Sequence, residues 1–98
     1  MTLEIFVSRE ARGDIAEAIS GFREISSELS ERFGVELDRI YSDIADYPQM
    51  YPVVYTNFRR ALLRSFPYSV FYIAERSLIL IVGVIHQSRD ESTWKRRA

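Results

Sequence analysis

Basic and aromatic side chains gather in the second half of the chain, at positions that could bind phosphate or carboxylate groups. Arginine binds either group through a two-pronged hydrogen-bonding fork, whereas lysine offers a point charge, and twelve of the thirteen basic residues are arginines. A cationic rim with one indole suits a phosphate-rich or acidic partner. The candidate binding residues are Arg59, Arg60, Arg64, His86, Arg89, Trp94, Arg96 and Arg97.

Several of these candidates also have a purely structural interpretation. His86 ends a predicted strand and could hydrogen-bond to the neighbouring backbone, and Trp94 could cover an open edge of the core. Alternation along a strand places Arg60 and Arg64 on one face, where they could bind a partner or pair with carboxylates of the helices. Both interpretations stay open for these four residues.

The sequence carries no recognisable catalytic motif. It lacks a phosphate-binding glycine loop, a dinucleotide fingerprint, a zinc-binding His-Glu helix and a nucleophile elbow. There are no cysteines, and His86 is the only histidine, so a disulfide scaffold, a cysteine nucleophile and a histidine-based metal cluster are excluded within the chain. We expect neither a metal nor a cofactor.

The length and the distribution of apolar residues predict one soluble domain spanning residues 1–98. A chain of 98 residues with 47% hydrophobic content can build one modest core. The longest apolar run, Leu78 to Ile85, is far shorter than the roughly 20 residues that a membrane-spanning helix needs. Residues 1–10 lack the apolar segment of a signal peptide. We therefore expect a cytoplasmic protein that does not contact a membrane.

Charge is divided unevenly along the chain, although its net value is only −1. Residues 1–46 contain eleven acids and five arginines, a net −6, whereas residues 47–98 contain eight bases and three acids, a net +5. This division predicts a basic working surface on the C-terminal half.

Hydrophobic spacing predicts a strand and two helices in the first half. Alternating apolar residues at 3, 5 and 7 predict a short strand. A helix of about Arg9 to Glu24 follows, with Ser8 as its N-cap, and Ser26 or Ser27 caps a second helix. That helix stops at Tyr47, because the residue before a proline avoids helical angles. The two amphipathic helices form an antiparallel hairpin.

Three strands are predicted in the second half, at Phe58 to Phe66, Tyr68 to Ala74 and Leu78 to His86. The last is apolar on both faces, which is typical of a central strand covered on two sides. The fold class is therefore α+β: an N-terminal strand, the helical hairpin and then a three-stranded antiparallel sheet. With the first strand the sheet has four strands, and the helices cover one face.

Three segments of the chain together resemble the RelE/ParE superfamily, the toxins of bacterial type II toxin–antitoxin pairs that are often called plasmid stabilisation proteins. They are RRALLRSFPYSVFY (residues 59–72), VIHQSRD (84–90) followed by Trp94, and PQMYP (48–52) after the helices. The resemblance covers nearly the whole chain, and the predicted elements follow the order of that family.

The resemblance implies a cognate antitoxin as partner and one of two modes of growth inhibition. The RelE branch cleaves messenger RNA on the ribosome as a metal-independent endoribonuclease, whereas the ParE branch inhibits DNA gyrase and cleaves nothing. Operator DNA would be contacted only through the antitoxin. A third alternative is a degenerate member that is no longer toxic and retains only antitoxin binding.

The residues favour the ParE branch. RelE-type enzymes tend to place an arginine where this chain has Ser69, and a tyrosine near the place of Trp94, whose indole cannot exchange a proton at neutral pH. His86 and Arg89 could still act as acid/base and phosphate clamp if the protein is a ribonuclease. The ending His-x-x-Arg-Asp looks more like ParE. We expect a toxin that binds an essential target, with gyrase ahead of the ribosome.

Overall fold

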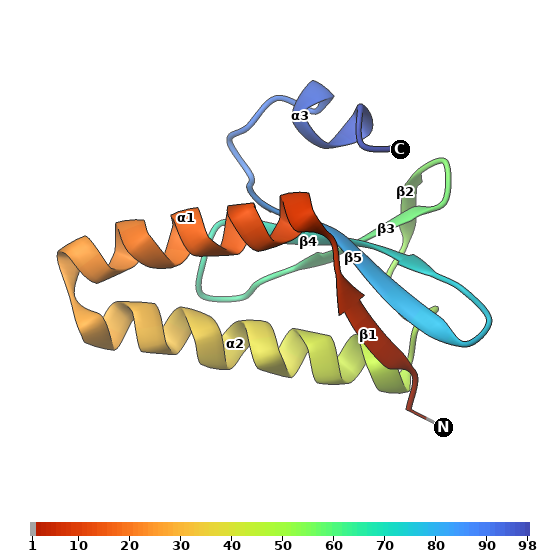
Figure 1. Ribbon diagram of the computed structural model, residues 1–98, viewed down its shortest axis with the longest axis horizontal. Coiled ribbons are helices and arrows are strands. Elements are labelled where there is room, and N and C mark those ends of the chain that lie inside the picture. Colours follow the sequence, from red (N-terminus) through yellow and green to blue (C-terminus); the bar gives the residue numbers. More distant parts are fainter. Residues whose placement is uncertain (1) are drawn as a thin grey trace.

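Two long helices follow the first strand and lie side by side in opposite directions in the computed structural model, which describes residues 2–98 (Figure 1). Helix α1 spans Arg9–Ile25 and helix α2 spans Ser27–Asp46. The Ser8 hydroxyl accepts the Ala11 N–H at 3.1 Å, and the Ser26 hydroxyl accepts the Leu29 N–H at 3.0 Å. These two caps confirm the predicted helix starts, and Ser26 alone separates the helices.

The sheet is mixed and has five strands in the order β1-β5-β4-β3-β2, which corrects the expected purely antiparallel sheet of four. Its strands are β1 (Glu4–Val7), β2 (Val53–Tyr55), β3 (Phe58–Leu62), β4 (Tyr68–Ala74) and β5 (Leu78–His86). Strand β1 pairs with β5 in parallel, while the other pairs are antiparallel. Strand β2 is the additional strand, in a stretch for which the sequence analysis predicted no strand.

Strand β3 ends at Leu62, four residues before the predicted end at Phe66. The reason is a carboxylate from α2: Glu36 accepts the backbone N–H groups of Arg64 and Ser65. These amides therefore bind a helix side chain instead of continuing the ladder with β4. The prediction for β4 and β5 is confirmed at both ends of each strand.

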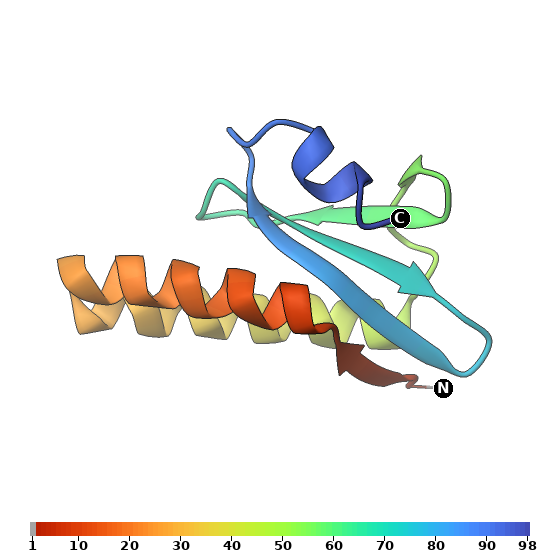
Figure 2. The same cartoon turned by 45° about the horizontal axis from the view of Figure 1, so that its top comes forward.

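The molecule has three layers, with α1 and α2 on one side of the sheet and the short helix α3 (Ser92–Lys95) on the other (Figure 2). Each interface has its own core. The helix-side core holds buried residues of both helices and of the inner sheet face, including Phe33, Ile44 and Tyr72. The outer core lies beneath α3 and consists of Phe58, Phe71, Val82, Ile85 and Trp94. Strand β5 is thus covered on both faces, as its composition predicted.

A β-bulge at Val82 changes which residues of β5 face each layer. Phe71 pairs with Gly83 and Tyr72 with Ile81, so Val82 has no partner on β4. Before the bulge Ile81 belongs to the helix-side core, and after it Val84 does. The extra residue therefore shifts the alternation by one position and turns Gly83 toward the C-terminal segment.

No helix within residues 2–98 is long and apolar enough to cross a lipid bilayer.

Candidate target-binding surface

An open hollow lies on the outer side of the sheet, between strand β3, the end of β5 and α3. Its volume is about 260 Å³. We call it the basic hollow and define it by Arg60, Leu62, His86, Arg89 and Trp94, which all line it. It brings together five side chains from three parts of the sequence. All of them except Leu62 were predicted from the sequence as binding residues.

Strand alternation supplies one wall of the basic hollow. Arg60 and Leu62 point to the outer side, whereas Ala61 lies in the helix-side core. The Leu62 side chain is 50% exposed, although it is large and apolar. Within residues 2–98 the Arg60 guanidinium forms no ion pair. The wall thus offers a free cation beside an exposed apolar group.

His86 ends β5 and is oriented by its immediate neighbours. Its Nδ1 accepts the Ser88 backbone N–H at 3.0 Å, and its ring meets the Tyr68 ring edge-on at 5.2 Å between centroids. The structural interpretation of His86, a strand-end histidine bonded to nearby backbone, is therefore confirmed. Because Nδ1 already accepts a hydrogen bond, the neutral ring carries its proton on Nε2.

Arg89 lies between two hollows. It lines the basic hollow, and together with His86 it also lines a second one of about 240 Å³ between α1, Tyr68 and the C-terminal segment. Its backbone N–H donates to the His86 carbonyl at 3.0 Å, which holds it directly after the strand. The Arg89 side chain is exposed, and within residues 2–98 it forms no ion pair.

Trp94 forms the floor of the basic hollow and contributes little exposed surface. It is 5% exposed and stacks on Phe71 with 4.3 Å between ring centroids. Tyr55 packs edge-on against it at 6.0 Å. The interpretation of Trp94 as a cover of the core is confirmed, so its contribution to binding is to shape the hollow.

The basic run after Trp94 is mostly engaged within the molecule, which corrects the expectation of a free cationic rim. Lys95 pairs with Glu91 at 2.8 Å, and its ammonium lies 5.0 Å from the Tyr55 ring centroid. Arg97 is half-buried and pairs with Asp14 of α1 at 2.7 Å. Arg96 alone is fully on the surface, outside the basic hollow.

Arg59 and Arg64 do not line the basic hollow. Arg59 turns to the α2–β2 connection and donates to the carbonyls of Tyr51 at 2.6 Å and Gln49 at 3.3 Å. Arg64 follows the end of β3, so the alternation that would pair it with Arg60 stops before reaching it. Arg64 therefore lies beyond the strand on which it was expected to share a face with Arg60, and within residues 2–98 neither side chain pairs with a helix carboxylate.

Sequence analysis singled out no individual carboxylate of the helices, and two of them have structural roles. Asp14 accepts the Val84 N–H at 3.0 Å as well as binding Arg97, and Glu36 is only 8% exposed. Both interrupt an apolar stripe: Asp14 lies between Ala11 and Ala18, and Glu36 lies three residues after a buried phenylalanine. An acid inside such a stripe is the signal that could have identified them.

Comparison with known proteins agrees with this architecture. The sequence model of the family described as "ParE toxin of type II toxin-antitoxin system, parDE" matches residues 5–91. A solved structure described as "Chromosomal ParDE TA system from P. aeruginosa" superposes with a TM-score of 0.75 at 12% sequence identity. That match covers 87% of this chain and 96% of the other, and at this identity it shows a shared fold. No curated protein sequence matches the chain.

The family match spans α1, α2 and every strand except the first residue of β1, and it ends just before α3. It also includes the three segments on which the resemblance rested, apart from Trp94. The chain therefore belongs to the ParE toxin family of type II toxin–antitoxin systems, which implies a cognate antitoxin as its partner.

Proposed function

We propose that this toxin arrests growth by binding DNA gyrase, and that the basic hollow contacts the target. One observation carries the proposal: the hollow joins an exposed leucine to two guanidinium groups that form no ion pair within residues 2–98, while its two possible proton acceptors, His86 Nδ1 and the Glu91 carboxylate, already accept hydrogen bonds. Gyrase is the target that the resemblance to the ParE branch implies, and membership of the ParE family supports this choice.

The composition of the hollow suits a protein partner with an acidic surface. Arg60 and Arg89 supply the charge, and Leu62 supplies apolar area that a partner can cover. Arginine and buried aromatic residues dominate the binding energy of protein interfaces, while charge complementarity directs the encounter. A surface that combines them supports inhibition by binding.

The same side chains are poorly arranged for cleaving RNA. Cleavage needs a base to take the proton of the ribose 2′-OH. His86 Nδ1 accepts the Ser88 N–H, and the Glu91 carboxylate, which also lines the hollow, is paired with Lys95. Burial raises the pKa of the Tyr68 phenol, with a smaller contribution from Glu17, which keeps the phenol protonated at neutral pH.

A ribosome-dependent ribonuclease is the second candidate, because His86 and Arg89 line the hollow together with Arg60. These groups could bind a phosphate and donate a proton from Nε2. The third candidate, a non-toxic member that retains antitoxin binding, predicts normal growth when the chain is expressed without an antitoxin.

Two assays with the purified protein separate these candidates: DNA supercoiling by gyrase and cleavage of ribosome-bound messenger RNA. We expect inhibition of supercoiling without cleavage. Cleavage with gyrase unaffected would establish the ribonuclease and reject our proposal. Activity in neither assay, together with normal growth on expression, would point to the degenerate member.

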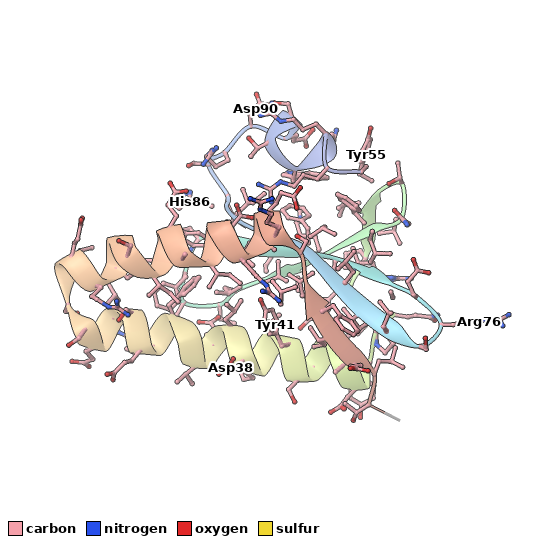
Figure 3. All side chains as sticks on the ribbon, viewed as in Figure 1. Asp38, Tyr41, Tyr55, Arg76, His86 and Asp90 are labelled. Atoms are coloured by element: carbon pink, nitrogen blue, oxygen red, sulfur yellow. The ribbon has the colours of Figure 1, made fainter. Side chains whose placement is uncertain are left out.

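Arginine variants locate the surface within whichever assay is positive. R60A and R89A remove the two free cations of the basic hollow. R76A is the matched control, because Arg76 is an exposed arginine in the β4–β5 turn, at the opposite end of β5 from His86 (Figure 3). We expect the first two variants to lose inhibition and R76A to retain it.

A further inference from the structure

We infer that Arg97 and Asp14 are positioning residues for the basic hollow, because their ion pair locks the C-terminal segment (residues 87–98) onto the outer face of the sheet. The inference rests on the proposed function, in which that hollow contacts the target. It assigns a role to two residues that lie outside the contact surface itself.

The ion pair is part of a larger junction with the backbone of β5. Arg97 donates from Nη1 to Asp14 Oδ2 at 2.7 Å and from Nη2 to Oδ1 at 3.1 Å, a two-pronged pair. Nη1 also donates to the Val82 carbonyl at 3.0 Å, and Asp14 Oδ2 accepts the Val84 N–H at 3.0 Å. One pair of side chains therefore connects α1, β5 and the end of the chain.

The bulge and the glycine that follows it make room for this junction. A Cβ atom built on Gly83 would lie 3.2 Å from Arg97 Nη1 and 3.1 Å from Ile85 Cδ1. Both distances are tighter than ordinary contacts, so any side chain at position 83 would press against the guanidinium. Because glycine has no side chain, position 83 leaves space for the Arg97 guanidinium to lie against β5.

Without this junction the C-terminal segment makes few other contacts that would keep it on the sheet. Helix α3 has four residues, and the side chain that accepts its first N–H, Asp90 Oδ1 at 2.8 Å from Ser92 N, belongs to the same C-terminal segment. A single helical turn is unstable unless tertiary contacts hold it. Apart from the packing of Trp94 and the contact of Lys95 with the Tyr55 ring, the segment is anchored at its start, where the Gln87 N–H donates to the Pro67 carbonyl at 2.7 Å.

Release of the segment would take the basic hollow apart. Trp94 and Glu91, which line it opposite Arg60, both belong to α3 or its cap. Arg89 lies between the strand end and α3, so its position depends on where the segment runs. Asp14 and Arg97 thus act on the binding surface through the placement of other side chains.

Fluorescence of Trp94 tests this directly, because it is the only tryptophan in the chain. We expect R97M and D14N to increase acrylamide quenching of Trp94 and to shift its emission to longer wavelength. Inhibition of gyrase supercoiling should fall about tenfold, which corresponds to about 1.4 kcal/mol of binding free energy. The far-UV melting transition, which reports on α1 and α2, should remain cooperative and near that of the wild type.

Two further variants make the test specific. The conservative variant R97K keeps a cation that can donate to Asp14 and to the Val82 carbonyl, so it should retain part of both the quenching protection and the inhibition. R12M is the matched control, since Arg12 is an exposed arginine of α1 two residues from Asp14. It should leave both readouts unchanged.

Each result bears on the inference separately from the proposed function. Unchanged quenching in R97M would show that the ion pair does not hold the C-terminal segment in place. An exposed Trp94 with full inhibition would reject the positioning role, while the proposal of gyrase binding would stand. If wild-type protein does not inhibit gyrase, the proposed function fails and growth arrest on expression becomes the readout. An R97M variant with exposed Trp94 that still arrests growth then overturns the inference.

Discussion

The indole of Trp94 stacks on the ring of Phe71, with 4.3 Å between their centroids and 21° between their planes. This contact joins a helix of a single turn to β4, the middle strand of the five-stranded sheet. It turns the outer face of the sheet, which carries Phe58, Phe71 and Ile85, into a closed second core. Trp94 also forms the floor of the basic hollow, so the same side chain contributes to the stability of the fold and to the shape of the proposed binding surface.

We predict that W94A lowers the free energy of unfolding by about 3 kcal/mol, since truncation of a buried tryptophan removes its contacts and leaves a cavity. W94F should lose less, because a phenyl ring can still stack on Phe71. Urea denaturation followed by far-UV circular dichroism measures both changes. The control is I25A, because Ile25 is 74% exposed and should lose little. Wild-type stability in W94A would show that the outer core does not depend on the indole.

A second prediction concerns Glu36, whose carboxylate accepts the N–H groups of Arg64 and Ser65. In E36Q the amide nitrogen replaces one acceptor oxygen, so a backbone donor loses its partner at a cost of about 1–3 kcal/mol. Amide hydrogen exchange at both positions should accelerate. E31Q, which alters an exposed glutamate of the same helix, should change neither exchange nor stability. Unaltered protection in E36Q would contradict the assigned role.

For the binding surface we predict that R60A and R89A each reduce growth arrest without unfolding the protein. Both side chains line the basic hollow without an ion pair in the described part of the chain. Loss of one central arginine should weaken target binding about tenfold or more. Titrated expression without antitoxin gives the measurement, with circular dichroism as the check on folding. Full toxicity of both variants at equal protein levels would place the contact surface elsewhere.

The last prediction concerns Tyr41, which points from α2 into the protein (Figure 3). Its hydroxyl is buried without a hydrogen-bond partner in residues 2–98. Burial, with a smaller contribution from Asp38, raises the pKa of Tyr41 from 10.0 to about 12. Y41F removes an unsatisfied group, so it should stabilise the protein by about 1 kcal/mol at pH 8.

The raised pKa also fixes the sign of a pH effect. Between pH 10 and about 12 the unfolded phenol is ionised while the folded one retains its proton, so unfolding releases a proton. Titration of Tyr41 therefore leaves the stability of the fold unchanged below pH 10 and lowers it progressively as the pH rises from 10 toward 12. The advantage of Y41F over the wild type should grow across this window in urea denaturation series. An advantage that does not change with pH would reject the shift.

Local chemistry could be predicted well because neighbours along the chain determine it. Ser8 and Ser26 cap helices through bonds to residues three positions away, and Tyr47 stops a helix because a proline follows it. Composition alone indicated that β5 is covered on both faces. The segments around Arg60, His86 and Arg89 were sufficient to recognise the family.

Contacts between distant segments could not be predicted in this way, because alternation and charge do not encode a partner. The parallel pairing of β1 with β5 joins residues about seventy positions apart. Arg97 was expected to face a target, yet it turns inward because Asp14, 83 positions earlier, lies in reach beside the gap at Gly83. Glu36 ends β3 in the same manner, from a helix.

The difference between the features that could be predicted from the sequence and those that could not has a simple physical basis. Backbone propensity, capping and hydrophobic period act over one or two turns, so they are visible in consecutive residues and they specify the helices and most strands. Which arginine remains free and which is neutralised depends on distances that exist only after the layers have packed. The folded chain therefore selected Arg60 and Arg89 for the surface and withdrew Arg59 and Arg97 into its own contacts.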